Sequence, residues 1–380
     1  MDSRTDPRIT APRVVDLRRG RTLDIEILAC VTYDFLISLH VALASAEHDY
    51  ADYDVGREWI ETARKRCQDA NPEALTILGR YLGDGRPGSL HATLISLVWR
   101  CPPPREPLGF LTWLEALPLP KLAEVLLDQE GLGADWSELL AATLEEHASP
   151  MGVGAAYKRL LARYPEEMRP TVAAVLGDLE GTRAELLTAL RVWYEAVFAT
   201  EQERILPLLR QEAEVMERRR SEMPLEAFIE QAMRGIQWQS TSGLRRIVFA
   251  PSYFCRPAVF YHVWHGTMTF CAPLAYTSPD AHRSDPRAPD EETLRFFLAL
   301  GDPSRLRILR LLAERQMYLT ELADRMELTK ATTKHHMVKL RDAGLVTLYD
   351  RDRMTFYALR PDVVRHARQL LSNYLELPSD

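Results

Sequence analysis

The sequence predicts a mainly α-helical protein with a large, irregular helical N-terminal domain, a short β-ribbon and a small C-terminal domain. Three observations lead to this prediction. Apolar residues recur every three or four positions from Leu23 to about Arg234. β-Branched and aromatic residues crowd Leu244–Leu274, and two short amphipathic patterns followed by alternating strands occupy Tyr318–Leu359.

The length of the chain, 380 residues, allows two or three hydrophobic cores. We expect a helical domain at 1–243, a ribbon at 244–276 packed on that domain, a polar linker containing prolines at 277–290, and the C-terminal domain at 291–380. No leader peptide opens the chain and no uncharged apolar stretch is long enough for a membrane span, so we expect a cytoplasmic protein without a membrane partner.

The charge distribution is uneven. A net charge of −7 argues against a uniformly basic nucleic-acid binder, whereas residues 291–360 carry 13 Lys and Arg against 10 Asp and Glu. The five cysteines are scattered singly, as expected for reduced thiols rather than a disulfide framework. The sequence thus indicates one mildly basic module on an acidic body.

The N-terminal periodicity predicts successive helices, including one in the segment Asp24–Leu43 (DIEILACVTYDFLISLHVAL). Proline and glycine clusters such as CPPPREP at 101–107 end individual helices. The run Arg210–Met223 alternates acidic and basic residues, which is typical of a solvated helix, although its RRR also permits interpretation as a basic nucleic-acid arm.

The ribbon contains a hairpin signal, because His265 and Gly266 can supply the positive φ angles of a tight turn between FYHVW and TMTFC. Its aromatic side chains could line a small-molecule pocket, or they could simply hold the ribbon against the helices. The ligand-binding candidates are Tyr253, Phe260, His262 and Trp264. His262 and His265, being three residues apart, should not chelate one ion.

The C-terminal domain shows clear helix signals. Asp302 and Pro303 are an N-cap and first-turn pair for PSRLRILRLLAERQ. After it, YLTELADRM predicts a short helix, EL a tight turn, and 329–341 a second helix that buries Thr333, Met337 and Leu340 and ends before Gly344. This spacing predicts a helix-turn-helix whose second helix enters the major groove of DNA.

The alternating segment 345–359 predicts a β-hairpin, or wing, beside that helix. Cations and small hydroxyl side chains occupy the outward side of the second helix, so we expect double-stranded DNA as the partner, although winged helices also serve as protein-docking modules. The predicted DNA-contacting residues are Thr329, Lys330, Ala331, Thr332, Lys334, His335, Lys339, Arg341, Arg351 and Arg353.

The segment Leu294–Leu359 resembles the winged helix of the ArsR family of bacterial repressors. The resemblance rests on FLALGDPSRLRILRLLAE and LADRMELTKATTKHHMVKLRDAGLV, and it covers about the last quarter of the chain. It implies an operator-binding repressor that dimerises through the helices flanking the motif, ETLRFFLAL and DVVRHARQLLSNYLEL. We therefore expect a homodimer.

Two departures from that family matter. Its metal-sensing members carry cysteines on the first helix of the motif, where this chain has Tyr318 and Thr320, and no cysteine follows Cys271. Asp362 and His366 stand four residues apart, which by default is a surface ion pair. We expect no metal site and no cofactor. The second departure is the length of chain before the winged helix, for which the resemblance implies no ligand.

Three classes compete for the N-terminal domain: a small-molecule sensor, a protein-partner or dimerisation scaffold without a ligand, and an enzyme. No P-loop, GxSxG, HExxH or GxGxxG occurs in a suitable context, so we expect no enzyme. We interpret the whole as a transcription regulator, a repressor modulated by a small-molecule effector at the N-terminal domain; the scaffold is the alternative.

Overall fold

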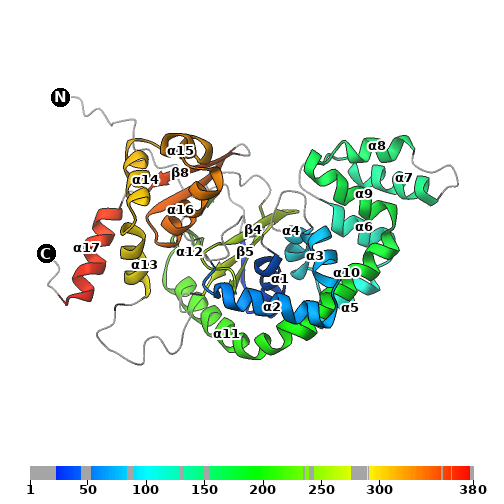
Figure 1. Cartoon of the computed structure of the whole chain (residues 1–380), viewed down its shortest axis with the longest axis horizontal. Coiled ribbons are helices and arrows are strands. Elements are labelled where there is room, and N and C mark those ends of the chain that lie inside the picture. The colour runs from blue at the N-terminus through cyan, green and yellow to red at the C-terminus, as the bar shows by residue number, and fades with distance from the viewer. Residues whose placement is uncertain are drawn as a thin grey trace. The chain divides into compact units, whose positions relative to one another are not determined.

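The structure, a computed structural model, describes residues 23–43, 53–83, 90–128, 132–148, 154–233, 236–238, 244–274, 289, 291–351, 354–360 and 362–376. The chain forms two compact units (Figure 1). The helical unit contains residues 24–214 and 244–274, and the winged-helix unit contains 215–243 and 275–380 together with the first 23 residues. The mainly α-helical class is confirmed.

This division differs from the boundaries expected from the sequence. Residues 215–243 group with the C-terminal domain rather than with the helices before them. The helix α11 (Ala199–Glu222) runs without a break through the division, and the strand β2 (Ile236–Trp238) pairs with a strand of the C-terminal sheet. The expected linker at 277–290 lies outside the described residues except for residue 289.

The helical unit is built mostly from short helices. They are α1 (Val31–Leu43), α2 (Gly56–Ala70), α3 (Ala74–Leu82), α4 (His91–Val98), α5 (Pro107–Ala116), α6 (Leu119–Leu127), α7 (Trp136–Ala148), α8 (Ala155–Leu161), η2 (Glu166–Met168), α9 (Arg169–Gly177), α10 (Leu179–Trp193), the π-helical η3 (Tyr194–Phe198) and the first part of α11. Figure 1 shows α7 and α8 as a pair at one end of this unit, with α6 and α9 between them and the other helices.

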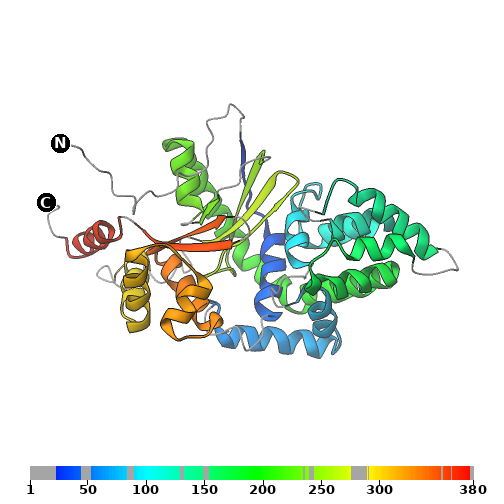
Figure 2. The ribbon, with the colours of Figure 1, turned by 90° about the horizontal axis from the view of Figure 1, so that it is seen from above.

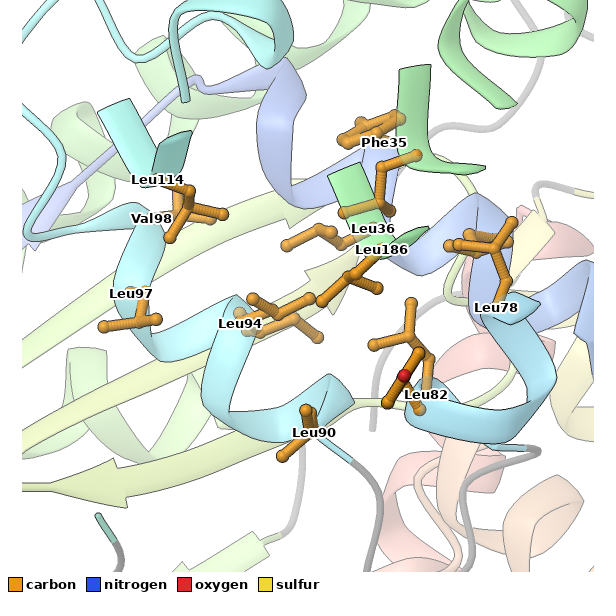
Figure 3. Close-up of a cluster of buried hydrophobic side chains, with 14 of the residues drawn as sticks. Phe35, Leu36, Leu78, Leu82, Leu90, Leu94, Leu97, Val98, Leu114 and Leu186 are labelled. Atoms are coloured by element: carbon orange, nitrogen blue, oxygen red, sulfur yellow. The ribbon is translucent and has the colours of Figure 1, made fainter. Parts of the chain in front are cut away.

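The core of the helical unit surrounds α1. Twelve of its thirteen residues, Val31 to Ala42, are buried, as expected for a helix that is apolar all round. Figure 3 shows leucines from α3, α4, α5 and α10 meeting Phe35 and Leu36 of this helix. Each fully buried leucine contributes about 2 kcal/mol to folding. Among the described residues the five cysteines are buried and form no disulfide.

A four-stranded sheet packs against α1 and α4. Its strands are β1 (Asp24–Ile27), β3 (Arg246–Ser252), β5 (Thr267–Pro273) and β4 (Phe260–Trp264), in that spatial order. β1, β3 and β5 run parallel, while β4 and β5 form the predicted antiparallel hairpin, with φ of 48° at His265 and 73° at Gly266. The predicted ribbon is therefore part of a larger sheet. Figure 2 shows its strands from a second direction.

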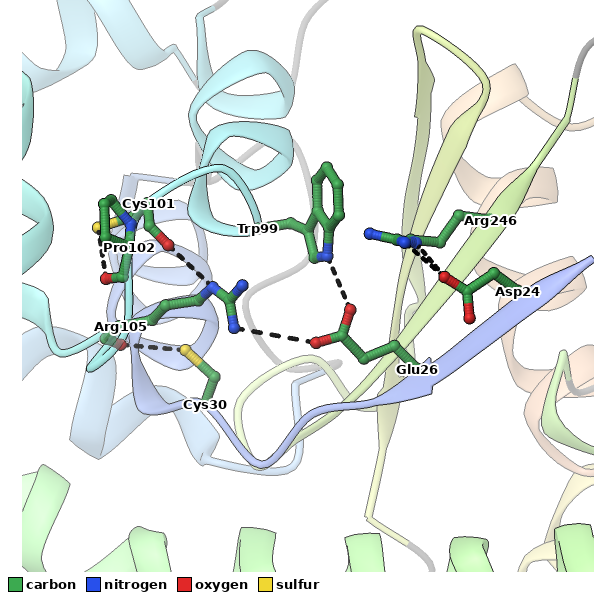
Figure 4. A network of polar contacts seen from close by, with 8 residues as sticks. All are labelled: Asp24, Glu26, Cys30, Trp99, Cys101, Pro102, Arg105 and Arg246. Atoms are coloured by element: carbon green, nitrogen blue, oxygen red, sulfur yellow. Dashed lines mark hydrogen bonds and ion pairs between the residues drawn. The ribbon is translucent and has the colours of Figure 1, made fainter.

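The strand β1 corrects the prediction of a helix beginning at Asp24. Its polar residues alternate with isoleucines and pair with neighbouring chain segments: Arg246 Nε donates to Asp24 Oδ2 at 2.6 Å, and Trp99 Nε1 donates to Glu26 Oε2 at 2.8 Å (Figure 4). Arg105 Nη1 lies 3.9 Å from Glu26 Oε1. The backbone of β1 is extended because it completes a ladder with β3, a contact across more than 200 residues.

The winged-helix unit contains the end of α11 and a second small core. Its remaining elements are α12 (Leu225–Ala232), β2, α13 (Glu291–Leu300), α14 (Pro303–Glu314), β6 (Met317–Tyr318), α15 (Leu319–Met326), α16 (Lys330–Asp342), β7 (Val346–Arg351), β8 (Met354–Leu359) and α17 (Val363–Tyr374). The strands form a sheet of order β2-β7-β8-β6. In Figure 2 the β7–β8 hairpin lies beside the orange helices α15 and α16. No described helix of either unit has the length and apolarity to cross a membrane.

Candidate nucleic-acid interface

The helix-turn-helix is built from α15, a three-residue turn and α16. Glu327 adopts the left-handed conformation with φ of 56° and ψ of 39°, which ends α15 and reverses the chain. The amide of Leu328 donates to the carbonyl of Ala323 at 3.0 Å, so the last turn of α15 is closed by the backbone itself. The position of the turn is as predicted, although its left-handed residue is a glutamate rather than a glycine.

The first turn of α16 is fixed by its own side chains. Thr329 is the N-cap: its Oγ1 accepts a hydrogen bond from the Thr332 amide at 3.1 Å. The carbonyl of the same residue accepts from Thr333 Oγ1 at 2.9 Å, which ties the helix start to its buried side. These bonds set where Lys330, Ala331 and Thr332 stand.

One side of α16 is buried and the other faces outward. Thr333, Met337 and Leu340 are fully buried, as predicted. Lys330, Ala331 and Lys334 are exposed, whereas Thr332, His335 and Lys339 are half-buried. The outward side thus has two exposed cations close to small side chains, with no bulky residue between them.

Charge on this side is unbalanced. Among the described residues, Lys330 and Lys334 have no ion-pair partner, whereas Arg315 and Arg325 near α15 both pair with Glu321. The side-chain hydrogen bond from Arg315 lowers the pKa of Glu321 below its ordinary value. Among the described residues of α16, Lys330 and Lys334 are therefore available to a polyanion.

The expectation that Arg341 adds exposed charge is wrong. Its side chain is only 8% exposed. Arg341 stands four residues after Met337, so the helix, which extends to Asp342, returns this position to the buried side. The four-residue spacing from a core methionine is the sequence signal that would have identified it.

The wing is a hairpin of β7 and β8, extended by β6, whose Met317 and Tyr318 pair with Tyr357 and Phe356 of β8. Gly344 precedes it with φ of 70°, and the amide of Leu345 donates to the carbonyl of Leu340 at 2.9 Å, ending α16. Arg351 is the last residue of β7, but its side chain lies outside the described structure, as does the whole of Arg353. Both remain predictions from the sequence.

His335 and His336, adjacent on α16, have different surroundings. His336 is half-buried, with its Nδ1 4.0 Å from Oδ1 of Asp302, the predicted and observed N-cap of α14. Desolvation would raise the pKa of Asp302, but the hydrogen bond from the Arg305 amide and the charges of Arg305 and His336 bring it below its ordinary value. His336 thus belongs to the packing of α16 on α14, and His335 to its outward side.

Known proteins resemble this part of the chain. A family model described as a helix-turn-helix domain matches residues 300–349, which include α14, α15 and α16. An uncharacterized HTH-type transcriptional regulator of Methanocaldococcus jannaschii is 34% identical over 82 residues, 92% of that protein and 21% of this chain. A protein of Synechocystis named as a transcriptional repressor SmtB homolog is 29% identical over 86 residues, 65% of that protein and 23% of this chain.

The chain belongs to the ArsR family of winged helix-turn-helix regulators. The transcriptional repressor SdpR of Bacillus subtilis is a further relative, 25% identical over 79 residues, 88% of that protein and 21% of this chain. This ArsR-family protein is accordingly a DNA-binding transcriptional regulator. The relatives match about a fifth of its length, so they describe the winged helix and not the helical unit.

Asp362 and His366 each have other contacts in this ArsR-family chain. Arg360 Nε lies 3.0 Å from Asp362 Oδ1, and the ring of His366 packs edge-on against Phe296 with centroids 5.4 Å apart. The i,i+4 pair noted in the sequence therefore has other contacts. Within the described ranges no three His, Cys, Asp or Glu side chains come together as a metal site.

The candidate ligand residues of the sheet come together only in part. Phe260, His262 and Trp264 alternate along β4 and face α4 or its neighbours. His262 Nδ1 lies 2.6 Å from Ser96 Oγ, Phe260 stacks edge-on against His40 at 4.8 Å, and Arg100 lies 4.7 Å from the centroid of the Trp264 ring.

Tyr253, the fourth candidate, lies away from that row. Its ring lies 4.4 Å beneath the guanidinium of Arg204. All four rings thus contact protein side chains, which favours the packing interpretation left open by the sequence. Only Trp264 Nε1, among the polar atoms of these four side chains, is buried without a hydrogen-bond partner in the described structure.

Proposed function

We propose that this regulator is a repressor that reads the major groove with α16 and contacts DNA with the wing at 345–359. The observation that supports the proposal is the pair of exposed cations Lys330 and Lys334, which have no ion-pair partner among the described residues and lie beside Ala331 and Thr332 on a helix whose other side is buried. Cations at such positions contact phosphates, while small hydroxyl and imidazole side chains between them contact base edges. Two of the relatives are named as repressors.

The proposed base contacts come from the half-buried residues of the same side. Thr332 and His335 are three residues apart, so they lie on one face of α16, and both carry hydrogen-bonding groups. Thr329 caps the helix and is exposed, so its hydroxyl and the first backbone amides lie at the N-terminal end of α16, the end that we propose enters the groove. Lys339, which is half-buried, follows them farther along the helix.

We further propose that the protein acts as a homodimer through α13 and α17. Leu294 and Leu298 on α13 are 46% and 61% exposed, and Leu371, Tyr374 and Leu375 on α17 are 43%, 42% and 50% exposed. They form apolar stripes at three- and four-residue spacing on two helices that pack on each other through Phe296 and His366. Large apolar stripes of this kind mark interfaces. Two copies would give the specificity that one winged helix lacks.

The helical unit is the proposed input domain, where a small-molecule effector would act. Its buried α1 and continuous core support a folded domain of its own. The competing role is a scaffold for a protein partner. Thermal-shift screening of metabolites on the full-length chain separates the two, because a ligand of the native state must raise its melting temperature.

The central experiment is selection of a preferred operator from random duplexes by the full-length protein, followed by substitution. Thr332→Ala and His335→Ala should each relax base preference, with loss of about 1 to 3 kcal/mol of discrimination at the contacted position. Lys334→Ala should weaken all duplexes alike. Unchanged base preference in both of the first two variants would mean that another face reads the DNA.

A further inference from the structure

The sheet of the winged-helix unit includes one strand from outside the winged helix itself. β2 pairs in parallel with β7, with Ile236 opposite Leu348, Gln237 opposite Tyr349 and Trp238 opposite Asp350. The matched family region begins at residue 300, more than 60 residues after β2. This strand is thus an addition to the helix-turn-helix module by the preceding part of the chain.

The added strand makes β7 an inner strand of the sheet. In the order β2-β7-β8-β6, β7 is an inner strand, whereas without β2 it would be an edge strand with one row of unpaired backbone groups. The pairing reaches Asp350, one residue before the end of β7 at Arg351. β2 therefore holds the wing strand close to the residues predicted to contact DNA.

The polypeptide reaches β2 directly after it leaves the helical unit. α11 is continuous from Ala199 to Glu222; its part up to Glu214 belongs to the helical unit and its end belongs to the winged-helix unit. Among the described residues, α12 is the one helix or strand between α11 and β2. A change in the path of α11 would therefore have a short stretch of chain through which to reach β2.

The pairing itself is short enough to be reversible. Three residues make few backbone hydrogen bonds, and elements with few bonds and little buried surface open more readily than the core of a domain. β7 keeps its six-residue antiparallel ladder with β8 when β2 leaves, so the hairpin persists but loses support on its other side.

We propose that β2 is a strap on the wing: when paired with β7 it fixes the wing for DNA binding, and its release is the step by which the helical unit lowers operator affinity. A fixed wing loses less conformational freedom on binding and therefore binds more tightly. This inference rests on the proposed use of the wing in DNA binding.

The test is made on the full-length protein with a selected duplex of about 30 base pairs, or three helical turns. A variant with Ile236→Gly, Gln237→Pro and Trp238→Gly removes a backbone donor and two strand-favouring side chains. The matched control, Gln237→Thr, keeps a strand-forming residue at the same place. Amide hydrogen exchange of residues 346–351 reports the pairing without DNA, and fluorescence anisotropy with the duplex reports affinity.

We expect the triple variant to exchange its β7 amides at least tenfold faster and to bind the duplex at least tenfold more weakly, with α16 exchange and the control unchanged. Unchanged β7 exchange would show that the strap does not pair in solution. Faster exchange with unchanged affinity would show that pairing does not govern binding. Either outcome overturns this inference, and the first leaves the proposed DNA contacts intact.

A second variant tests the same proposal if the triple variant also loses the protection of its α16 amides from exchange. Paired Cα atoms of neighbouring strands are about 4.8 Å apart, within the range of about 4.4 to 6.8 Å that a disulfide spans. Gln237→Cys with Tyr349→Cys should therefore cross-link the strap to β7 on oxidation, while the five native thiols are buried. The oxidised protein should bind the duplex at least as tightly as the reduced one, and its β7 amides should exchange more slowly. In the Gln237→Cys single variant, oxidation should change neither duplex affinity nor β7 exchange. Weaker binding after cross-linking would overturn the inference.

Discussion

The hydroxyl oxygen of Thr329 lies 3.1 Å from the backbone nitrogen of Thr332 and accepts its hydrogen bond, so the helix proposed to enter DNA begins at a fixed residue. The same oxygen lies 2.8 Å from the hydroxyl of Thr332. Because these bonds close the first turn, they hold the side chains of Lys330 and Ala331 in place before any DNA arrives.

Removing the cap should loosen the start of α16. Thr329→Ala leaves the Thr332 amide without its acceptor, at a cost of about 1 kcal/mol. Thr329→Ser keeps the oxygen and is the matched control. We expect faster amide exchange at residues 331–333 and weaker operator binding in the alanine variant alone. Equal exchange in the two variants would contradict the capping role.

Replacing each of two glycines by alanine should change the folding stability in opposite directions. Gly344 has φ of 70°, and an added Cβ would lie 3.2 Å from Arg360 Nη1, so Gly344→Ala should lower stability by about 1 kcal/mol. Gly79 lies within α3 with no atom within 4 Å of the added carbon, so Gly79→Ala should raise stability by about 1 kcal/mol. Denaturant unfolding measures both; the same sign in both variants would count against the conformational argument.

The salt dependence of DNA binding should depend on Lys334. Its ammonium group is exposed and has no ion-pair partner among the described residues, so Lys334→Ala should weaken binding to every duplex and reduce the slope of log K against log salt by about 1. Lys158 on α8 is also exposed but belongs to the helical unit, so Lys158→Ala is the control and should leave the slope unchanged. An identical slope in the two variants would exclude Lys334 from the interface.

The proposed dimer should dissociate when its apolar stripes are charged. Leu298→Asp and Leu371→Asp place carboxylates on the exposed faces of α13 and α17 without disturbing a buried side chain. Phe297, also on α13, is half-buried and so less suitable. Leu108→Asp on α5, 44% exposed, is the control. Light scattering at micromolar concentration should give a dimer for the native and control proteins and a monomer for the double variant. A native monomer would refute the assembly.

Stability should depend on pH through Asp34. Burial raises the pKa of Asp34 from 3.8 to about 7, although one carboxylate oxygen accepts bonds from Ser252 Oγ and the amides of Tyr253 and Phe254. The folded state therefore holds a proton that the unfolded chain has lost, so this stabilising contribution is present below pH 3.8 and is lost as pH rises through 7, by about 4 kcal/mol.

Asp34→Asn keeps an acceptor oxygen and removes the charge. Its stability relative to the native protein should rise between pH 5 and 8, measured by denaturant unfolding; Asp34→Ala, which loses the acceptor, should be less stable than Asp34→Asn throughout. Burial acts in the opposite sense on two histidines, because it lowers the pKa of His91 and His262 to about 4. The stability that their neutral rings give to the fold is present above pH 6.5 and is lost as pH falls below 6.5. A relative stability that does not change with pH would show that Asp34 is already ionised in the fold.

The sequence predicted the helix-turn-helix well because its boundaries are encoded locally. Asp302, Thr329 and Gly344 each have a short-range preference for a cap or a left-handed turn, and the structure places them at those ends. The inward residues of α16 follow from the same local spacing. The prediction assigned Arg341 to the outward side of α16 because of its charge. Its four-residue distance from the buried Met337 predicts the inward side, where the structure has it.

The strands β1 and β2 could not be predicted in this way. DIEI precedes the buried helix α1 and continues its periodic apolar residues, so only pairing with β3, far along the chain, makes it extended. β2 has three residues, too few for a periodic signal, and its partner β7 lies about a hundred residues later. The division of the chain into units was missed for the same reason, because it depends on contacts distant in sequence.

The two units are interleaved along the chain, since the polypeptide passes between them after Glu214, Gly243 and Leu274. A protease or a gene fusion that separates the protein near residue 290 would therefore leave the C-terminal piece without β2 and the N-terminal piece with a strand that has lost its partner. Neither unit can be exchanged between proteins as one uninterrupted stretch of gene. Recombination that moved this winged helix together with its added strand to a new input domain would have to carry residues 215–243 as well.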